Sequence, residues 1–134
     1  GKLVVPVGIL TKPGRLDPEE IEVVRLHTTS GARLLTDAGS DTLEVRVALA
    51  HHERWDGKGY PHGHSGDDIP LPARMTAIAD VFDALCADRP YAAGMARNRA
   101  LAIMTTEMRG AFDPDLLAEF MDLVRLPVEE TAAA

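Results

Sequence analysis

Residues 71–87 read LPARMTAIADVFDALCA, and this stretch decides the fold. Its apolar side chains recur every three or four residues, which places them on one face of an α-helix. No other segment of the chain has so long an apolar face. We therefore predict a helix from about Leu71 to Ala87 at the centre of an all-helical domain. The predicted buried face comprises Met75, Ile78, Ala79, Phe82 and Leu85.

The composition supports an all-α fold and limits the partners. Hydrophobic residues make up 46% of the 134 residues and aromatic residues only 4%, so the core must be built from aliphatic side chains, as in packed helices. This length suits one domain, or a portion of one. The net charge of −7 argues against binding to a nucleic acid polymer, which needs a surface rich in lysine and arginine.

Five further segments carry helix signals. Asp17 and Pro18 form a strong helix start, because Asp caps a first turn and Pro fits its first position. Asp41 and the Asp113–Pro114 pair offer similar starts, whereas residues 1–14 contain Pro and Gly and are expected to be irregular. The predicted helices run from about 18 to 26, 29 to 38, Asp41 to His52 or Glu53, 97 to 108 and 114 to 126, with a flexible tail at about 127–134.

The sequence also bears on the environment of the chain. Its single cysteine, Cys86, excludes an internal disulfide and a thiolate metal site. Apolar runs long enough to cross a membrane are absent from the sequence, as is a signal-like start. We therefore expect a cytoplasmic location and no membrane contact from this segment.

His51, His52 and Glu53 are the strongest local indication of chemistry. They are predicted at a helix end and precede a loop, residues 55–70, with four glycines and two prolines. Two adjacent imidazoles at one height on a helix can serve one or two metal ions. The alternative is that one histidine favours the helix dipole as a cation and the other is a half-buried polar residue.

His27 and Asp80 are weaker candidates for the same site. His27 ends a predicted helix and, judged alone, is more typical of a hydrogen-bonded or surface histidine. Asp80 lies beside the apolar face of the 71–87 helix, where an unpaired buried carboxylate would be costly. Local pattern does not distinguish it from Asp83, which suits a solvated face.

Longer motifs give these residues a context. HHERWDGKGYP, residues 51–61, resembles the signature of HD-GYP domains, and IPLPARMTAIADVFDALCADRPY, residues 69–91, resembles the stretch that follows it in that family. Upstream, ILTKPGRLDPEE and RLHTTSGARLL are similar to further family elements. The resemblance extends from residue 1 to about residue 125.

The resemblance implies an HD-domain-like helical bundle with a long glycine-rich GYP loop, here the HD-GYP domain portion in residues 1–134. The implied activity is metal-dependent hydrolysis of cyclic di-GMP, a bacterial second messenger, with two divalent ions, iron or manganese, in the complete domain. The implied metal ligands are His27, His51, His52 and Asp80; Tyr60 and Arg89 match substrate contacts, and Lys2 matches a catalytic lysine that contacts phosphate.

Some of these residues have simpler explanations. Tyr60 and Trp55 would then close the loop against the core, and Arg89 would cap a helix end. The family pattern has no ligands at His62 and His64, which we therefore expect to be surface residues.

The sequence departs from the family pattern at its start. The His-Asp pair that names the family would precede Gly1, and no His-Asp dipeptide occurs within the 134 residues. We therefore expect residues 1–134 alone to be inactive and to cover apolar surface by self-association as a homodimer. Ala92 also replaces a usual basic residue. The second hypothesis is a non-catalytic module that binds a nucleotide or a protein, such as a diguanylate cyclase or a sensor domain.

Overall fold

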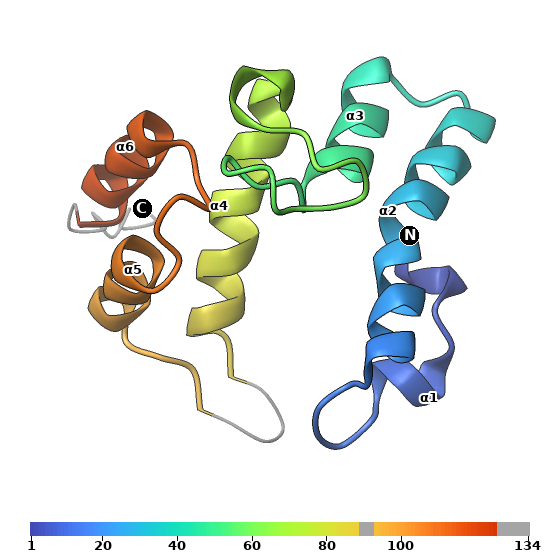
Figure 1. Ribbon diagram of the computed structural model, residues 1–134, viewed down its shortest axis with the longest axis horizontal. Coiled ribbons are helices and arrows are strands. Elements are labelled where there is room, and N and C mark those ends of the chain that lie inside the picture. The colour runs from blue at the N-terminus through green and yellow to red at the C-terminus, as the bar shows by residue number, and fades with distance from the viewer. Residues whose placement is uncertain (89–92, 126–134) are drawn as a thin grey trace, which may run out of the picture.

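The computed structural model describes residues 1–88 and 93–125, and the elements in those ranges are all helical (Figure 1). This confirms the all-α prediction. Arg89, Ala92 and the predicted tail lie outside the described residues. The elements are η1 (Lys2–Val4), α1 (Val7–Leu10), α2 (Pro18–Asp37), α3 (Thr42–Ala50), η2 (Gly66–Asp68), α4 (Leu71–Cys86), α5 (Arg97–Thr106) and α6 (Pro114–Arg125).

The helix α2 corrects one prediction and confirms another. Its start is as predicted: Asp17 accepts a hydrogen bond from the N–H of Glu20 at 2.9 Å, and Glu20 accepts one from the N–H of Asp17. However, α2 runs unbroken for 20 residues, so the predicted break between residues 26 and 29 is wrong. The hydroxyls of Thr28 and Thr29 bond to carbonyls one turn earlier in the same helix, which lets these residues remain helical.

The remaining boundaries differ from prediction by small amounts. The helix α3 ends at Ala50, so His51 and His52 follow it instead of forming its last turn. Residues 1–14 contain two short helical elements, η1 and α1, where irregular chain was predicted. Most of their apolar side chains are exposed, with Leu3 at 92% and Val7 at 72%. Self-association through such surface remains a prediction.

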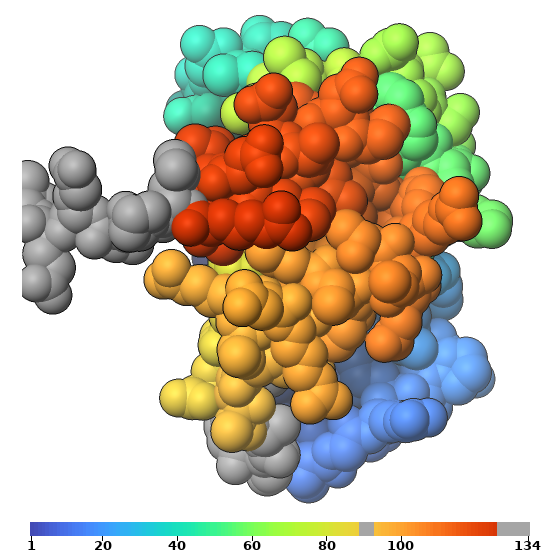
Figure 2. Space-filling model, turned by 90° about the vertical axis from the view of Figure 1, so that its left-hand side faces the viewer, coloured from blue at the N-terminus to red at the C-terminus, as the bar shows by residue number. Residues whose placement is uncertain are grey.

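The helix α4 stands between two groups of helices, with α2 and α3 on one side and α5 and α6 on the other (Figure 1). From the side, α5 and α6 cover α4 (Figure 2). The main core gathers here around Ile78 and Met104, and the rings of Phe82 and Phe120 meet edge to face at 5.2 Å. The central position predicted for the 71–87 helix is confirmed.

A substitution within α4 tests how much this core contributes to the free energy of unfolding. Ile78 is 2% exposed, whereas Met75, one turn earlier, is 56% exposed. The predicted burial of Met75 is therefore wrong, as is that of Ala79, which is also exposed. We expect Ile78→Ala to lower the free energy of unfolding by about 2 to 5 kcal/mol, because it removes buried methyl groups and leaves a cavity. Met75→Ala, the matched control, should cost less than about 1 kcal/mol. Urea denaturation of both variants tests this, and equal losses would contradict it.

Candidate metal and substrate site

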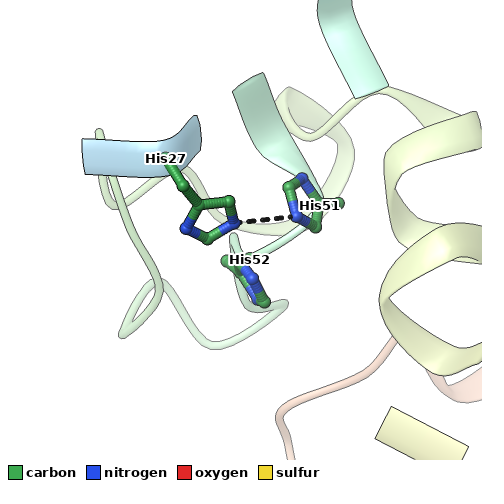
Figure 3. Close-up of side chains that lie close together, drawn as sticks. All are labelled: His27, His51 and His52. Atoms are coloured by element: carbon green, nitrogen blue, oxygen red, sulfur yellow. Dashed lines mark hydrogen bonds between the residues drawn. The ribbon is translucent and has the colours of Figure 1, made fainter. Parts of the chain in front are cut away.

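Three histidines, one within α2 and two directly after α3, lie close together. His27 lies within α2, His51 caps the C-terminus of α3, and His52 follows it. Each residue offers a ring nitrogen, and these three nitrogens all lie within 4.8 Å of one another. Figure 3 shows a ring nitrogen of His27 pointing toward a ring nitrogen of His51, with His52 beside both. We call these residues the histidine cluster.

Backbone carbonyls determine which ring nitrogen of His27 and of His51 carries the proton. His27 Nδ1 lies 2.7 Å from the carbonyl oxygen of Val24, and His51 Nδ1 lies 3.0 Å from that of Ala48. Since a carbonyl oxygen only accepts, both Nδ1 atoms carry the proton and both Nε2 atoms present lone pairs. Helix geometry thus fixes the tautomers in the way that typically orients metal-binding histidines.

The two free nitrogens lie unusually close together. His27 Nε2 and His51 Nε2 are 3.3 Å apart. Two lone pairs at this separation repel unless a proton or a metal ion lies between them. A cation satisfies both, because nitrogens 3.3 Å apart can each reach one ion at about 2.1 Å, a normal metal–imidazole bond length. The donor set therefore fits a divalent metal ion.

The surroundings keep His52 neutral. Burial, together with the positive charges of protonated His51 and His27, lowers the pKa of His52 to about 4. Burial likewise lowers the pKa of His27. Neutral imidazole is the form that binds metal, so His27 and His52 are ready to do so at neutral pH.

Asp80 is not part of this cluster. Its side chain is exposed on α4, and its carboxylate is absent from the group of ligand atoms that lie within 4.8 Å of one another. Its negative charge nevertheless acts on His52, where it partly opposes the lowering of the pKa. The expected convergence of all four side chains is therefore seen for three of them, with Asp80 nearby.

Lys2 lies on the same side of the molecule as the cluster. Its positive charge contributes to the lowered pKa values of both His27 and His52. Lys2 is exposed, in the short helix η1, which packs against α2. An exposed lysine beside the cluster can approach an anionic ligand bound there.

Glu53 anchors the glycine-rich loop, a role that sequence reasoning missed. It is 3% exposed, and its two carboxylate oxygens accept hydrogen bonds from the backbone N–H groups of His62 at 2.7 Å and His64 at 3.0 Å. Gly59 passes so close to Glu53 that a β-carbon added at residue 59 would lie 2.5 Å from the Glu53 Cα. The loop is therefore folded tightly onto the residue that follows His52.

This fold brings Tyr60 to the histidine cluster. The Tyr60 N–H donates to the His52 carbonyl at 3.1 Å, and its ring stacks on the His52 ring at 4.8 Å. Arg25 of α2 lies over the Tyr60 ring at 5.1 Å, a second contact that the sequence did not indicate. Burial raises the pKa of Tyr60 to about 12, so its phenol remains a hydrogen-bond donor at neutral pH.

A cavity of about 290 Å³, lined by both polar and apolar residues, lies beside the histidine cluster and Tyr60. Its lining includes the positive side chains of Arg25 and Lys58 together with Tyr60, His51 and His52. Cations beside metal-binding histidines favour an anionic ligand such as a phosphate ester. Lys58 is exposed and borders this cavity.

Trp55 holds the loop against the rest of the domain, which is the simpler of the explanations given above for this residue. Its backbone N–H donates to the Ala111 carbonyl at 2.9 Å, and the Arg74 guanidinium lies 5.4 Å from the centre of its ring. These contacts join the start of the loop to the segment between α5 and α6. His62 and His64 are exposed, as predicted.

Comparison with known proteins identifies the family. A profile described as HD domain matches residues 1–116, most of the chain. The chain belongs to the HD domain family. The relatives of this HD domain include the cyclic di-GMP phosphodiesterase response regulator RpfG of Xanthomonas campestris, 43% identical over 116 residues, covering 85% of the chain and 31% of the relative.

A second relative differs in substrate. The 3'3'-cGAMP-specific phosphodiesterase 3 of Vibrio cholerae is 42% identical over 130 residues, which cover 97% of the chain and 28% of the relative. The HD domain therefore spans about three tenths of the length of these curated relatives.

Solved structures agree on the fold. Bd1817, an HDG"Y"P protein of Bdellovibrio bacteriovorus, superposes with a TM-score of 0.70 at 19% identity, covering 92% of this chain and 42% of that one. This supports the HD-GYP resemblance at the level of the fold. Within the described ranges, none of the helices combines the length and apolar character needed to span a bilayer.

The lowered pKa of His52 predicts a pH-dependent stability for the metal-free HD domain. Between its ordinary value of 6.5 and about 4, the unfolded chain binds a proton that the folded chain does not. The free energy of unfolding should therefore fall as the pH falls through this window. Allowing for partial exposure of the ring, we expect a loss of about 1 to 2 kcal/mol between pH 7 and pH 5.

Urea denaturation in the presence of a chelator measures this loss. The His52→Asn variant lacks the titrating group and should lose less stability than the parent over the same two pH values. Equal losses in the two proteins would show that His52 is not the group responsible.

Proposed function

We propose that this chain supplies part of the metal centre and the substrate-binding loop of a metal-dependent phosphodiesterase that hydrolyses cyclic di-GMP. The observation that carries the proposal is the 3.3 Å approach of two unprotonated Nε2 atoms, His27 and His51, beside a cavity with positive side chains. The relatives named as cyclic dinucleotide phosphodiesterases support the substrate class. The proposed setting is bacterial second-messenger signalling in the cytoplasm.

The proposed ligands are His27, His51 and His52, with Asp80 as a carboxylate ligand from the neighbouring helix. A set of nitrogen and oxygen donors without thiolate suits iron or manganese, and we propose two ions in the complete domain. When bound, such ions lower the pKa of water and neutralise charge on a phosphodiester. The chain itself contributes fixed imidazole tautomers and a carboxylate charge close to His52.

The substrate would lie in the cavity beside the cluster. Tyr60 can donate a hydrogen bond from its neutral phenol, and Arg25 and Lys58 can pair with phosphate oxygens. Lys2, whose charge acts on His27 and His52, offers a further positive charge. Arg89 keeps its proposed role as a substrate contact, although it lies outside the described residues.

A hydrolysis assay on the full-length protein that contains this domain tests the proposal. With Mn²⁺ or Fe²⁺, we expect conversion of cyclic di-GMP to a linear product, detected by chromatography, and no conversion after metal chelation. A parallel assay with 3'3'-cGAMP tests the choice of base, since similar relatives are named for each substrate. Binding of cyclic di-GMP without hydrolysis under either metal would overturn the proposal and favour a non-catalytic module.

A further inference from the structure

A second group of side chains that could hold a metal ion lies where the glycine-rich loop packs against Glu53. His62 and His64 are both exposed, and their rings are stacked with centroids 5.2 Å apart. Together with Glu53 they offer three ligand atoms that all lie within 4.8 Å of one another. The sequence has five histidines, so every one of them belongs either to this group or to the histidine cluster.

We propose that Glu53, His62 and His64 form a separate binding site for a divalent transition-metal ion of the zinc type. Two imidazoles and one carboxylate are a common ligand set for Zn²⁺, and a fourth position is left for water. Ligands that share one ion at about 2.1 Å lie roughly 3.4 Å apart, so the side chains must close by a small amount. The two exposed rings can rotate to do so, because solvent surrounds them.

The hydrogen bonds of Glu53 leave it able to coordinate. Each carboxylate oxygen accepts one backbone N–H, from His62 or from His64, and each oxygen has a further lone pair. These bonds also fix the direction of the carboxylate, as outer-shell bonds do in metal sites. The same N–H groups belong to the two histidines, so one arrangement positions all three ligands. Gly63, with φ +69°, makes the turn between the two histidines.

The proposed ion would hold the loop in place. Glu53 directly follows His52, and Tyr60 is bonded to the His52 carbonyl. An ion that joins Glu53 to residues 62 and 64 would therefore secure both ends of the segment that presents Tyr60. This inference concerns metal binding outside the histidine cluster, and it stands independently of the proposed hydrolysis.

Zn²⁺ titration by calorimetry tests the site, in a protein whose histidine cluster is disabled by His51→Ala. We expect one Zn²⁺ ion to bind in this background. Adding His62→Ala or His64→Ala should weaken that binding by at least about tenfold, because loss of a direct ligand costs no less than loss of an outer-shell partner. Ser65→Ala, a neighbouring exposed substitution on the same loop, should leave the affinity unchanged.

Two further readouts separate the site from other effects. In NMR spectra of the His51→Ala protein, Zn²⁺ should shift the ring signals of His62 and His64. It should also raise the melting temperature, and His64→Ala should remove that rise without changing the melting temperature in chelator. Unchanged affinity in both histidine variants, or unmoved His62 and His64 signals at saturating Zn²⁺, would overturn the proposal.

Discussion

Replacing His51 with alanine in the full-length protein is expected to reduce hydrolysis of cyclic di-GMP by at least about a thousandfold. His51 provides one of the two Nε2 atoms that lie 3.3 Å apart, so its loss removes half of the closest ligand pair. Metal ions contribute several kcal/mol to transition-state stabilisation, and each 1.36 kcal/mol corresponds to a tenfold change in rate.

Metal analysis connects this loss to its cause. The His51→Ala protein should retain its helical circular dichroism but contain less bound manganese or iron than the parent. Arg46→Ala is a suitable control, because Arg46 is exposed in the same helix and takes no part in the cluster. Near-normal turnover by the His51 variant would show that the histidine cluster takes no part in the hydrolysis.

A polypeptide limited to residues 1–134 is expected to show no hydrolysis of cyclic di-GMP above background. The described residues bring three histidines together, with Asp80 outside their group. The family resemblance implies a bridging aspartate in a His-Asp pair, a dipeptide that these 134 residues lack. A site that holds one ion without a bridging ligand does not support two-metal chemistry.

The comparison is between this polypeptide and a longer one that includes the His-Asp pair expected upstream. Both should be assayed with Mn²⁺ and with Fe²⁺, and the longer polypeptide should hydrolyse the substrate. Robust turnover by residues 1–134, abolished by His51→Ala, would mean that another residue of the chain completes the site.

The elements with strong local signals were predictable. The central α4 and the Asp17–Pro18 start of α2 both follow from side-chain periodicity and capping, which depend on neighbours along the chain. Periodicity did not indicate which side chains of that face are covered, since Met75 and Ala79 are exposed. The predicted break in α2 was wrong, because the intrahelical hydroxyl bonds of Thr28 and Thr29 are compatible with a helix. Propensity alone does not reveal such bonds.

The site was predictable where a motif marks it. His51 and His52 stand in a recognisable sequence, and family resemblance added His27. The roles of Glu53 and Arg25 were not apparent, since each depends on a contact with a loop that only the folded chain creates. Burial of Glu53 is a tertiary property, and its position after two histidines gave no sign of it.

The attachment of the loop to Glu53 has a consequence for how this protein can evolve. Glu53 contacts the main chain at positions 62 and 64, and any amino acid except proline supplies the N–H groups that it needs. Side chains at these positions can therefore change without loss of the anchor. The loop tip is free to acquire new recognition groups by single substitutions, while the part of the same loop that carries Tyr60 keeps its shape.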